Sequence, residues 1–531
     1  MGLSPDLGLA VAIGVWLFVL ALSLAQRPLL PIDETRYLSV AWEMWLRDSW
    51  LVPYLNDATY SSKPPMLFWL INIAWTITGV SETVGRAVPT LFVPLSALLT
   101  VWLARLLWPE RPGAAGASAV LLAGSFLFLV SSSLVMFDAM LTACVLLGFV
   151  GVVQVWRSGR WLWWLLVGLA IGLGVLVKGP VILVHLLPAA LLAPLWQGHR
   201  PFGWWLRWFA GLLGALLLGA GLALAWALPA AEAGGQAYGD QILWSQFAGR
   251  VSKSFDHARP WWFFLPILPA AFFPWLWWQP VWRAVGGLRA HLADPGLRLT
   301  LLWSALVLIL FSMISGKQAH YLLPMVPPVA LWLGRLLDDH SSGGRWTLAL
   351  PFGLPLLVAL GGLALPWLVP MLQESYPDVQ PPLWLVELST EAWIAVILCL
   401  ATLWLVAALA PKLRLTALTV MAAALFAVGQ GAGHGLAYAH FDLRPIARML
   451  AVHDDGPIAM AGLYQGEFGF LGRLQRPLET VAWKQADAWL AANPQGLMVI
   501  RNKGSEPIAL QGERRFVMPY RDRWISVWSG R

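Results

Sequence analysis

The chain has 531 residues, of which 59% are hydrophobic and 12% charged, with a net charge of +7. A soluble domain carries about a quarter charged residues, so this composition excludes an ordinary soluble enzyme as well as a disordered chain. Of the 63 charged side chains, 35 of them Lys or Arg and 28 Asp or Glu, 21 lie in the last 92 residues. These counts indicate a polytopic membrane protein with one soluble part at its C-terminal end.

Membrane-spanning helices need about 20 mostly apolar residues, and the hydrophobic pattern predicts thirteen of them. They cover residues 8–26, 86–107, 115–134, 138–156, 162–178, 180–196, 208–229, 261–279, 299–315, 321–337, 347–370, 391–410 and 415–435. The short loops on one side hold 13 basic and four acidic residues, which predicts that this side is cytoplasmic. The residues after the last span are then expected outside the membrane.

Two long outer loops, residues 27–85 and 230–260, are expected to form the roof of any active site in the membrane domain, residues 1–439. Within the first loop, Met66–Thr78 is apolar but too short to span, which predicts an interfacial helix. The last segment, residues 440–531, alternates helix-like and strand-like pieces and predicts a small α/β domain. The helix-like pieces are Leu443–His453 and Ala482–Ala492, and the strand-like ones Pro457–Gly462, Leu497–Ile500, Arg515–Met518 and Trp524–Val527.

Ionisable residues close to the membrane are costly and usually functional. In the predicted orientation, all of the unusual ones fall at the outer ends of spans or in outer loops: Asp33, Glu34, Lys63, Asp138, Lys178, Asp256, His257, Arg259, Lys317 and His320. A transporter would hold such groups near the membrane midplane. Their gathering at one face favours catalysis at the outer leaflet over transport.

Several of these residues also have a plainer explanation. Asp33 and Glu34, followed by Arg and Tyr, suit a base and its orienting partner, or simply the acidic first turn of a helix. Lys63, followed by two prolines, suits a lipid phosphate or a lysine that anchors a helix at the interface. Asp138 heads a span without a basic residue nearby in the sequence, which favours a functional role. Lys178 suits either function or a tight turn.

Together these segments resemble the membrane glycosyltransferases of the GT-C fold. The resemblance rests on their order: Asp-Glu-Thr-Arg-Tyr at 33–37, Lys-Pro-Pro at 63–65, Asp138, His257 before Pro-Trp-Trp-Phe-Phe, and Tyr-Leu-Leu-Pro at 321–324. The most similar branch is that of the lipid A aminoarabinose transferases, which are related to the protein O-mannosyltransferases. The resemblance covers residues 1–440 and, more loosely, the C-terminal domain.

The resemblance implies transfer of a sugar from a polyprenyl-phosphate donor, such as an undecaprenyl phosphate, to an acceptor outside the membrane. By the same resemblance, Asp33 and Asp138 are the carboxylates at the reaction centre, and Lys63 and Arg259 bind the donor phosphate. The residues expected to line the pocket of the donor head group are Glu34, Tyr37, Tyr60, Lys317 and Tyr321, and His257 corresponds to a metal-binding histidine.

One position departs from the family pattern. Relatives carry a metal-binding glutamate immediately before the lysine, and Ser62 stands there in this chain. A divalent metal ion is therefore an open expectation: either metal is not used, or Asp57 or Asp256 replaces the glutamate, or His257 has another role. No other cofactor is expected, and the absence of a phosphate-binding loop or dinucleotide fingerprint speaks against a nucleotide.

We therefore expect a multi-pass enzyme of the bacterial inner membrane, a monomeric inverting glycosyltransferase with its active site on the periplasmic side. Its expected partners are the donor, the bilayer and a lipid or glycan acceptor such as a lipid A-like glycolipid, and not nucleic acid. The alternatives are a protein O-glycosyltransferase or O-antigen-modifying enzyme of the same fold, a lipid transporter, and a scaffold protein.

Overall fold

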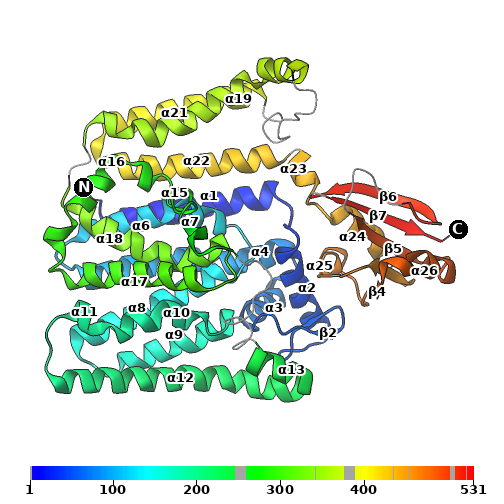
Figure 1. Cartoon of the computed structure of the whole chain (residues 1–531), viewed down its shortest axis with the longest axis horizontal. Coiled ribbons are helices and arrows are strands. Elements are labelled where there is room, and N and C mark those ends of the chain that lie inside the picture. The colour runs from blue at the N-terminus through cyan, green and yellow to red at the C-terminus, as the bar shows by residue number, and fades with distance from the viewer. Residues whose placement is uncertain are drawn as a thin grey trace.

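The computed structural model describes residues 3–245, 259–340, 343–375, 389–434, 436–453, 455–502, 509–521 and 523–530. Most of these residues form a bundle of helices, and a β-sheet close to the C-terminus is attached to one end of the bundle (Figure 1). The ends of the helices therefore gather at two opposite faces of the bundle, and only one of these faces carries the sheet.

Eight helical stretches in the described residues are long and apolar enough to cross a membrane. They are α1 (Pro5–Gln26), α4 (Glu82–Thr90) with α5 (Phe92–Leu107), α8 (Asp138–Ser158), α12 (Phe202–Gly234), α17 (Pro295–Met313), α19 (Ala349–Ser375), α21 (Thr390–Leu409) and α22 (Arg414–His434). Short 3-10 turns, η6 (Arg345–Leu348) and η7 (Pro411–Leu413), precede α19 and α22. The protein is thus a predominantly helical, multi-span membrane protein.

The remaining predicted spans correspond to shorter or interrupted helices. They are α6 (Pro112–Gly124), α7 (Phe126–Ser131), α9 (Trp163–Lys178), α10 (Val181–Leu191), α11 (Ala193–Gln197), η5 (Ala319–Met325) and α18 (Val326–Asp338). The span predicted over 261–279 differs most, because it consists of η2 (Trp261–Phe264), α15 (Leu268–Ala271) and η3 (Trp275–Trp277). Pro266, Pro269 and Pro274 explain the breaks, since proline lacks the N–H that continues a helix.

Close packing of small residues holds the bundle together. A side chain at Gly8 of α1 would place its Cβ 2.4 Å from the backbone oxygen of Gly116 in α6, so the two helices cross in backbone contact. Such contacts replace the hydrophobic effect as the reason for helix association in lipid. α8 is the most buried of the long helices, whereas α12 and α21 keep most of their apolar surface exposed, as expected of helices that face lipid.

Ion pairs join the basic loops at the face of the bundle away from the sheet. Arg105 lies 3.0 Å from Asp6, Arg111 pairs with Asp339, and Arg335 lies 3.4 Å from Asp294. After η3 the chain crosses this region through α16 (Gln279–Gly286) and η4 (Leu288–His291). The loops predicted to be cytoplasmic therefore share one end of the bundle.

At the opposite end, the first long loop folds over the bundle. It contains α2 (Asp33–Leu46), a short hairpin of β1 (Tyr54–Leu55) and β2 (Ala58–Thr59), and α3 (Met66–Thr78), whose bounds are those of the predicted interfacial helix. The small elements α13 (Gln236–Asp240), η1 (Gln241–Ser245) and α23 (Leu436–Ala439) lie in the later loops.

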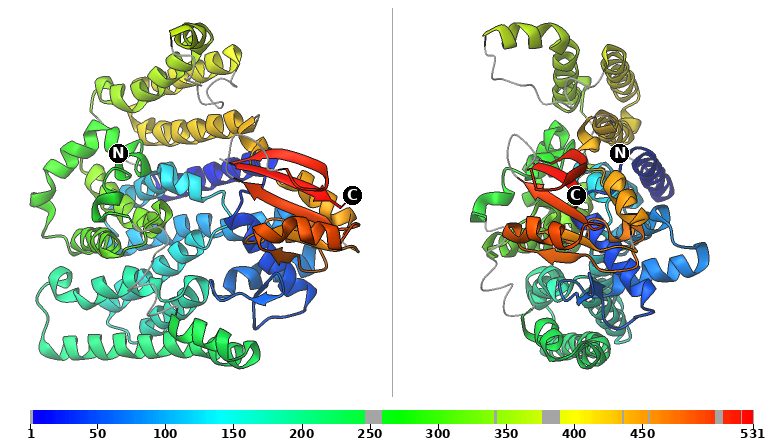
Figure 2. Two further views of the ribbon diagram at one scale, coloured as in Figure 1. Left: turned by 45° about the vertical axis from the view of Figure 1, so that its right-hand side comes forward. Right: turned by 90° about the vertical axis from the view of Figure 1, so that its right-hand side faces the viewer.

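The C-terminal part contains a mixed five-stranded sheet in the order β4-β3-β5-β7-β6. Its strands are β3 (Ile458–Ala461), β4 (Glu479–Val481), β5 (Leu497–Asn502), β6 (Glu513–Tyr520) and β7 (Arg523–Ser529), and its helices are α24 (Arg444–Val452), α25 (Gly469–Gly472), η8 (Trp483–Gln485) and α26 (Ala486–Ala492). β3 is parallel to β4 and β5, and β7 is antiparallel to β5 and β6. In Figure 1 and in the left view of Figure 2 this part lies at the end of the bundle that carries α2.

Candidate active site

Asp33 opens α2 at the end of the bundle that carries the sheet. Its carboxylate pairs with Arg36 one helical turn later, and the hydroxyl of Tyr37 donates to Asp33 Oδ1 over 3.3 Å. The Asp33 side chain is 47% exposed. A carboxylate that is oriented by an arginine and a tyrosine, yet open to a ligand, is suited to act as a base.

Glu34, the next residue, has a different environment. It is buried, it pairs with Arg27, and it accepts hydrogen bonds from the backbone N–H groups of Leu30 and Val135 over 2.7 and 2.8 Å. Burial alone would raise the pKa of Glu34, but Arg27 and these N–H groups hold it below its ordinary value. Glu34 therefore ties the start of α2 to the loop that leads into α8.

Arg86 of α4 completes this buried network from the other side. Its guanidinium donates to the backbone oxygens of Arg27 and Ser23 over 2.9 and 2.6 Å. Arg27 in turn donates to the backbone oxygen of Ser133 over 2.8 Å. The network fixes the end of α1 and the start of α2 relative to the loop before Asp138.

Asp138 is the first residue of α8, and its side chain is only 3% exposed. The ammonium group of Lys178, the last residue of α9, lies 2.6 Å from Asp138 Oδ1. The same ammonium group lies 4.8 Å from the centre of the Tyr321 ring, a distance typical of a cation–π interaction. Three helical elements therefore meet at Asp138.

Five ionisable groups from five segments form one cluster. Asp138 interacts electrostatically with Lys178, His320 and Lys63. His320 also interacts with Asp33. We call Asp33, Lys63, Asp138, Lys178 and His320 the charged cluster. The structure thus brings together three of the four residues that the sequence placed at the reaction centre or on the donor phosphate.

Aromatic rings pack beside this cluster. Tyr37 lies edge-on to Phe137 at 5.0 Å between ring centres, and Phe68 of α3 contacts both Phe137 at 5.8 Å and Tyr60 at 6.2 Å. Because Phe137 directly precedes Asp138, these rings connect α2 and α3 to the start of α8. The rings of Tyr37, Tyr60, Phe68 and Phe137 therefore form an aromatic layer next to the charged cluster.

Arg259 and Lys317 lie in two segments that contact each other. The Lys317 ammonium group donates to the backbone oxygen of Arg259 over 2.9 Å, and the Arg259 N–H donates to the Ser315 oxygen over 3.1 Å. The Arg259 side chain is exposed, with its guanidinium 5.8 Å from the centre of the Phe263 ring. Lys317 therefore holds the chain at Arg259, and the role of Arg259 on a phosphate stays a prediction.

The residues expected to bind a metal ion lie only partly within the described residues. His257 and Asp256 lie outside the described residues, and Ser62 is exposed. Over the described part of the chain, no group of three or more His, Cys, Asp or Glu side chains could hold a metal ion. A serine hydroxyl is also a weak ligand compared with the carboxylate that it replaces.

The sequence alone assigns no specific role to Lys178 and His320, although both stand out as unusual charges. Their partner Asp138 is 40 and 182 residues away in the sequence. Lys178 and His320 come close to Asp138 only because α9 and η5 pack beside α8. The one signal in the sequence was that all three residues fall at predicted outer ends of helices.

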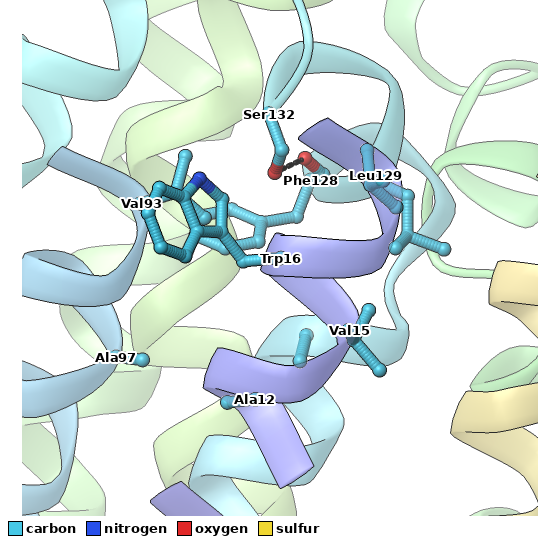
Figure 3. Close-up of a pocket in the computed structure, with 10 residues that line it drawn as sticks. Ala12, Val15, Trp16, Val93, Ala97, Phe128, Leu129 and Ser132 are labelled. Atoms are coloured by element: carbon cyan, nitrogen blue, oxygen red, sulfur yellow. Dashed lines mark hydrogen bonds between the residues drawn. The ribbon is translucent and has the colours of Figure 1, made fainter. Parts of the chain in front are cut away.

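A separate apolar pocket lies between α1, α5 and α7 (Figure 3). Its lining includes Trp16, Val93 and Phe128. Ser132 also lines the pocket, and its hydroxyl group donates to the backbone oxygen of Phe128. No ionisable side chain lines this pocket. It therefore offers no catalytic chemistry, in contrast to the charged cluster.

Comparison with known proteins identifies both the fold and the family. The family model described as dolichyl-phosphate-mannose-protein mannosyltransferase matches residues 62–226. The chain also superimposes on ArnT from Cupriavidus metallidurans bound to undecaprenyl phosphate, with a TM-score of 0.74, 18% identity, and coverage of 98% of this chain and 97% of that one. At this identity the match shows a shared fold, and the fold together with the family match defines a membrane glycosyltransferase of the GT-C class.

Two curated relatives narrow the class. The undecaprenyl phosphate-alpha-4-amino-4-deoxy-L-arabinose arabinosyl transferase 1 of Pseudomonas fluorescens is 32% identical over 385 residues, 70% of this chain and 67% of the relative. An equivalent transferase of Pectobacterium carotovorum is 32% identical over 363 residues, so that the match spans 64% of this chain and 62% of that relative. The chain belongs to the undecaprenyl phosphate-aminoarabinose arabinosyl transferase family.

Proposed function

We propose that the protein transfers a sugar from a polyprenyl-phosphate donor to an acceptor at the outer surface of the membrane. The charged cluster carries this proposal, because it sets two carboxylates beside two lysines at one end of the bundle. The names of the relatives make undecaprenyl phosphate the proposed carrier and aminoarabinose the first sugar to test. The proposed acceptor is a lipid A-like glycolipid.

The cations make departure of the phosphate easier. A polyprenyl phosphate leaves the sugar with negative charge on its oxygens, and preorganised positive groups stabilise this charge in the transition state. Lys63 is assigned to the donor phosphate, and Lys178 adds a second positive charge beside Asp138. Arg259 is proposed as a further phosphate contact from the rim of the site.

The carboxylates act on the other side of the reaction. The acceptor group needs alignment and, if it is a hydroxyl, a base within hydrogen-bonding reach. Asp33 is the more exposed of the two and is proposed as that base. Asp138, buried and paired with Lys178, is proposed to stabilise the positive charge that develops on the sugar. One displacement by the acceptor inverts the anomeric centre.

The other assigned residues take supporting roles in this proposal. Tyr37, Tyr60 and Tyr321 line the head-group pocket. Glu34 was expected in that pocket, but its carboxylate oxygens are used by Arg27 and backbone N–H groups, so we assign it to positioning α2. Lys317 likewise positions the chain at Arg259.

The proposed arrangement in the membrane follows from the two ends of the bundle. We propose thirteen crossings, with the basic loops on the cytoplasmic side of a bacterial inner membrane and the charged cluster on the periplasmic side. The C-terminal domain, residues 440–531, then lies in the periplasm. We propose that the protein acts as a monomer.

Mass spectrometry of the lipids and envelope glycans from a deletion strain tests the function, because it reports donor and acceptor together. The proposal predicts loss of one sugar from a lipid A-like glycolipid and accumulation of the matching undecaprenyl-phosphate sugar. Restoring the wild-type gene should reverse both changes, and a gene encoding Asp138→Asn should reverse neither. Unchanged glycolipid and donor pools would contradict the proposal, and loss of a sugar from a protein instead would favour a protein O-glycosyltransferase.

A further inference from the structure

One segment of the C-terminal domain, residues 464–474, is hydrogen-bonded to Ser39 of α2. The Ser39 hydroxyl donates to the backbone oxygen of Gly466 over 2.9 Å and accepts from the N–H of Phe470 over 3.0 Å. Ser39 is 1% exposed, so water does not compete for these bonds. We call this segment, together with Ser39, the α2 clasp.

Further contacts extend the clasp along α2 and onto α3. The Trp42 indole N–H donates to the backbone oxygen of Leu474 over 2.9 Å. The ring of Phe470 stacks on Trp75 at 5.4 Å, and the Arg473 guanidinium lies 3.7 Å from the centre of the Phe470 ring. The clasp therefore contacts both α2 and α3 through specific polar and aromatic contacts.

Gly466 brings the backbone of the clasp onto the first turns of α2. Its φ of +85° favours glycine, and a Cβ there would lie 3.0 Å from the Cα of Arg36 and 2.9 Å from a methyl carbon of Leu55. A larger residue would have to push α2 or the hairpin away. The close approach falls at Arg36, the residue that pairs with Asp33.

The clasp also carries a buried carboxylate whose charge acts on Arg36. Glu467 is fully buried, pairs with Arg501 of β5, and accepts from the Gln465 N–H over 2.7 Å. Burial raises the pKa of Glu467, and the positive charges of Arg501 and Arg36 oppose that rise. Arg36 therefore pairs with Asp33 of the active site and also interacts electrostatically with Glu467 of the C-terminal domain.

We propose that the α2 clasp is a positioning element that holds Asp33 in its reactive orientation through Arg36 and Ser39. The inference rests on the proposed role of Asp33 and gives the C-terminal domain a part in catalysis. If the clasp only attached the C-terminal domain to the bundle, small changes in the segment would alter neither kcat nor the surroundings of Asp33.

The first test compares two serines of the same region in purified full-length protein. Ser39→Ala removes both hydrogen bonds and should lower kcat about tenfold or more with little change in KM for the donor, since small displacements of a catalytic group are costly. Ser49→Ala, which removes a local bond to Val52, should behave as wild type. Equal kcat values for Ser39→Ala and wild type would overturn the inference.

The second test compares two glycines of the C-terminal domain that both have positive φ. Gly466→Ala should lower kcat, because its Cβ would meet Arg36 and Leu55. Gly462→Ala strains the same domain at φ +88°, but its Cβ would meet Trp483 and not α2. If the two variants lower kcat by the same factor and lower the melting temperature by the same amount, the effect is one of domain stability and the inference is wrong.

A reversible lock makes the test independent of how well single variants fold. A Cβ at Gly469 would lie 3.4 Å from the Cβ of Ser39, close to the ~3.8 Å of a disulfide. We expect the Ser39→Cys, Gly469→Cys variant, made in a Cys144→Ala, Cys399→Ala background, to have near wild-type kcat when oxidised and to lose several-fold on reduction. An oxidised protein no more active than the reduced one would contradict the inference.

A readout without turnover separates this inference from the proposed function. Asp33→Cys in the same cysteine-free background gives a thiol whose rate of reaction with a maleimide reports its surroundings. The inference predicts that adding Gly466→Ala changes this rate several-fold, whereas adding Gly462→Ala leaves it unchanged. Identical rates in the two would overturn the inference, whether or not the protein transfers a sugar.

Discussion

At the scale of single residues, the site depends on how charges are paired at the edge of an apolar bundle. Asp138 is buried and would be costly to ionise alone, so Lys178 is essential to its charged state. Glu34 is equally buried, but its partners are Arg27 and backbone N–H groups. The two carboxylates therefore have different tasks in this account: Asp138 is proposed to act in the reaction, and Glu34 anchors the helix that carries Asp33.

The pairing of Lys178 with Asp138 predicts the behaviour of three variants. Lys178→Met should reduce turnover by about a hundredfold or more, because a preorganised charge is lost, and should lower the melting temperature, because Asp138 is left unpaired. Adding Asp138→Asn should restore much of the melting temperature but no turnover. Lys412→Met, at an exposed position in a basic loop, serves as the control. Wild-type turnover by Lys178→Met would show that this lysine is only structural.

The lowered pKa of Glu34 predicts a pH dependence of stability. Below the ordinary pKa of 4.5, the unfolded chain binds a proton at this residue more readily than the folded protein does. The stabilisation is thus fully present above pH 4.5 and is lost as the pH falls through the lower folded pKa. Melting temperatures measured from about pH 6 down to about pH 3.5 should fall less steeply for Glu34→Gln than for wild type. Glu110→Gln, at an exposed position, should keep the wild-type slope, and equal slopes in all three would refute this account.

At the scale of elements, proline and glycine account for where the sequence predicts helices well and where it does not. The sequence predicts the helix Met66–Thr78 with its observed bounds, because a short apolar run that follows proline and ends at a glycine is typical of a single short helix. The span over 261–279 is not predicted with its observed bounds, because averaging hydrophobicity ignores three prolines. β4 was missed since it has three residues, two of them exposed, and so lacks a strand pattern.

The crossing of α1 and α6 predicts which glycine of α1 tolerates a side chain. Gly8→Ala would place a Cβ 2.4 Å from the Gly116 oxygen and should destabilise the protein by about 1–3 kcal/mol. Gly14→Ala, in the same helix, meets nothing within 4 Å and should be neutral or slightly stabilising. Thermal unfolding of the two variants in detergent measures the difference. Similar melting temperatures would mean that α1 and α6 are not packed in backbone contact.

At the scale of the whole molecule, the two ends of the bundle divide the charges by task. One end gathers basic loops that pair with Asp6, Asp294 and Asp339. The other gathers the charged cluster, α2, α3 and the C-terminal sheet, and Figure 1 shows these helices and the sheet at that end. Sequence reasoning could find this division, because it needs only the order of spans and charges. It could not find the Asp138–Lys178 pair or the α2 clasp, which join residues 40 and more than 400 positions apart.

The proposed topology predicts the labelling of two single cysteines in a Cys144→Ala, Cys399→Ala background. Val452→Cys, at a residue 92% exposed in the C-terminal domain, should react with a membrane-impermeant maleimide in intact spheroplasts. Ser158→Cys, at an exposed residue at the end of α8, should react only after the membrane is opened. The reverse pattern would invert the proposed orientation.

The central claim is that Asp33 and Asp138 form the reaction centre, and release of sugar from a polyprenyl-phosphate donor by purified protein tests it most directly. Asp33→Asn and Asp138→Asn, each with its melting temperature checked, should abolish that release. Asp6→Asn, which changes a carboxylate in the first turn of a helix at the other end of the bundle, should keep it. Full turnover by both Asp33→Asn and Asp138→Asn would contradict the claim.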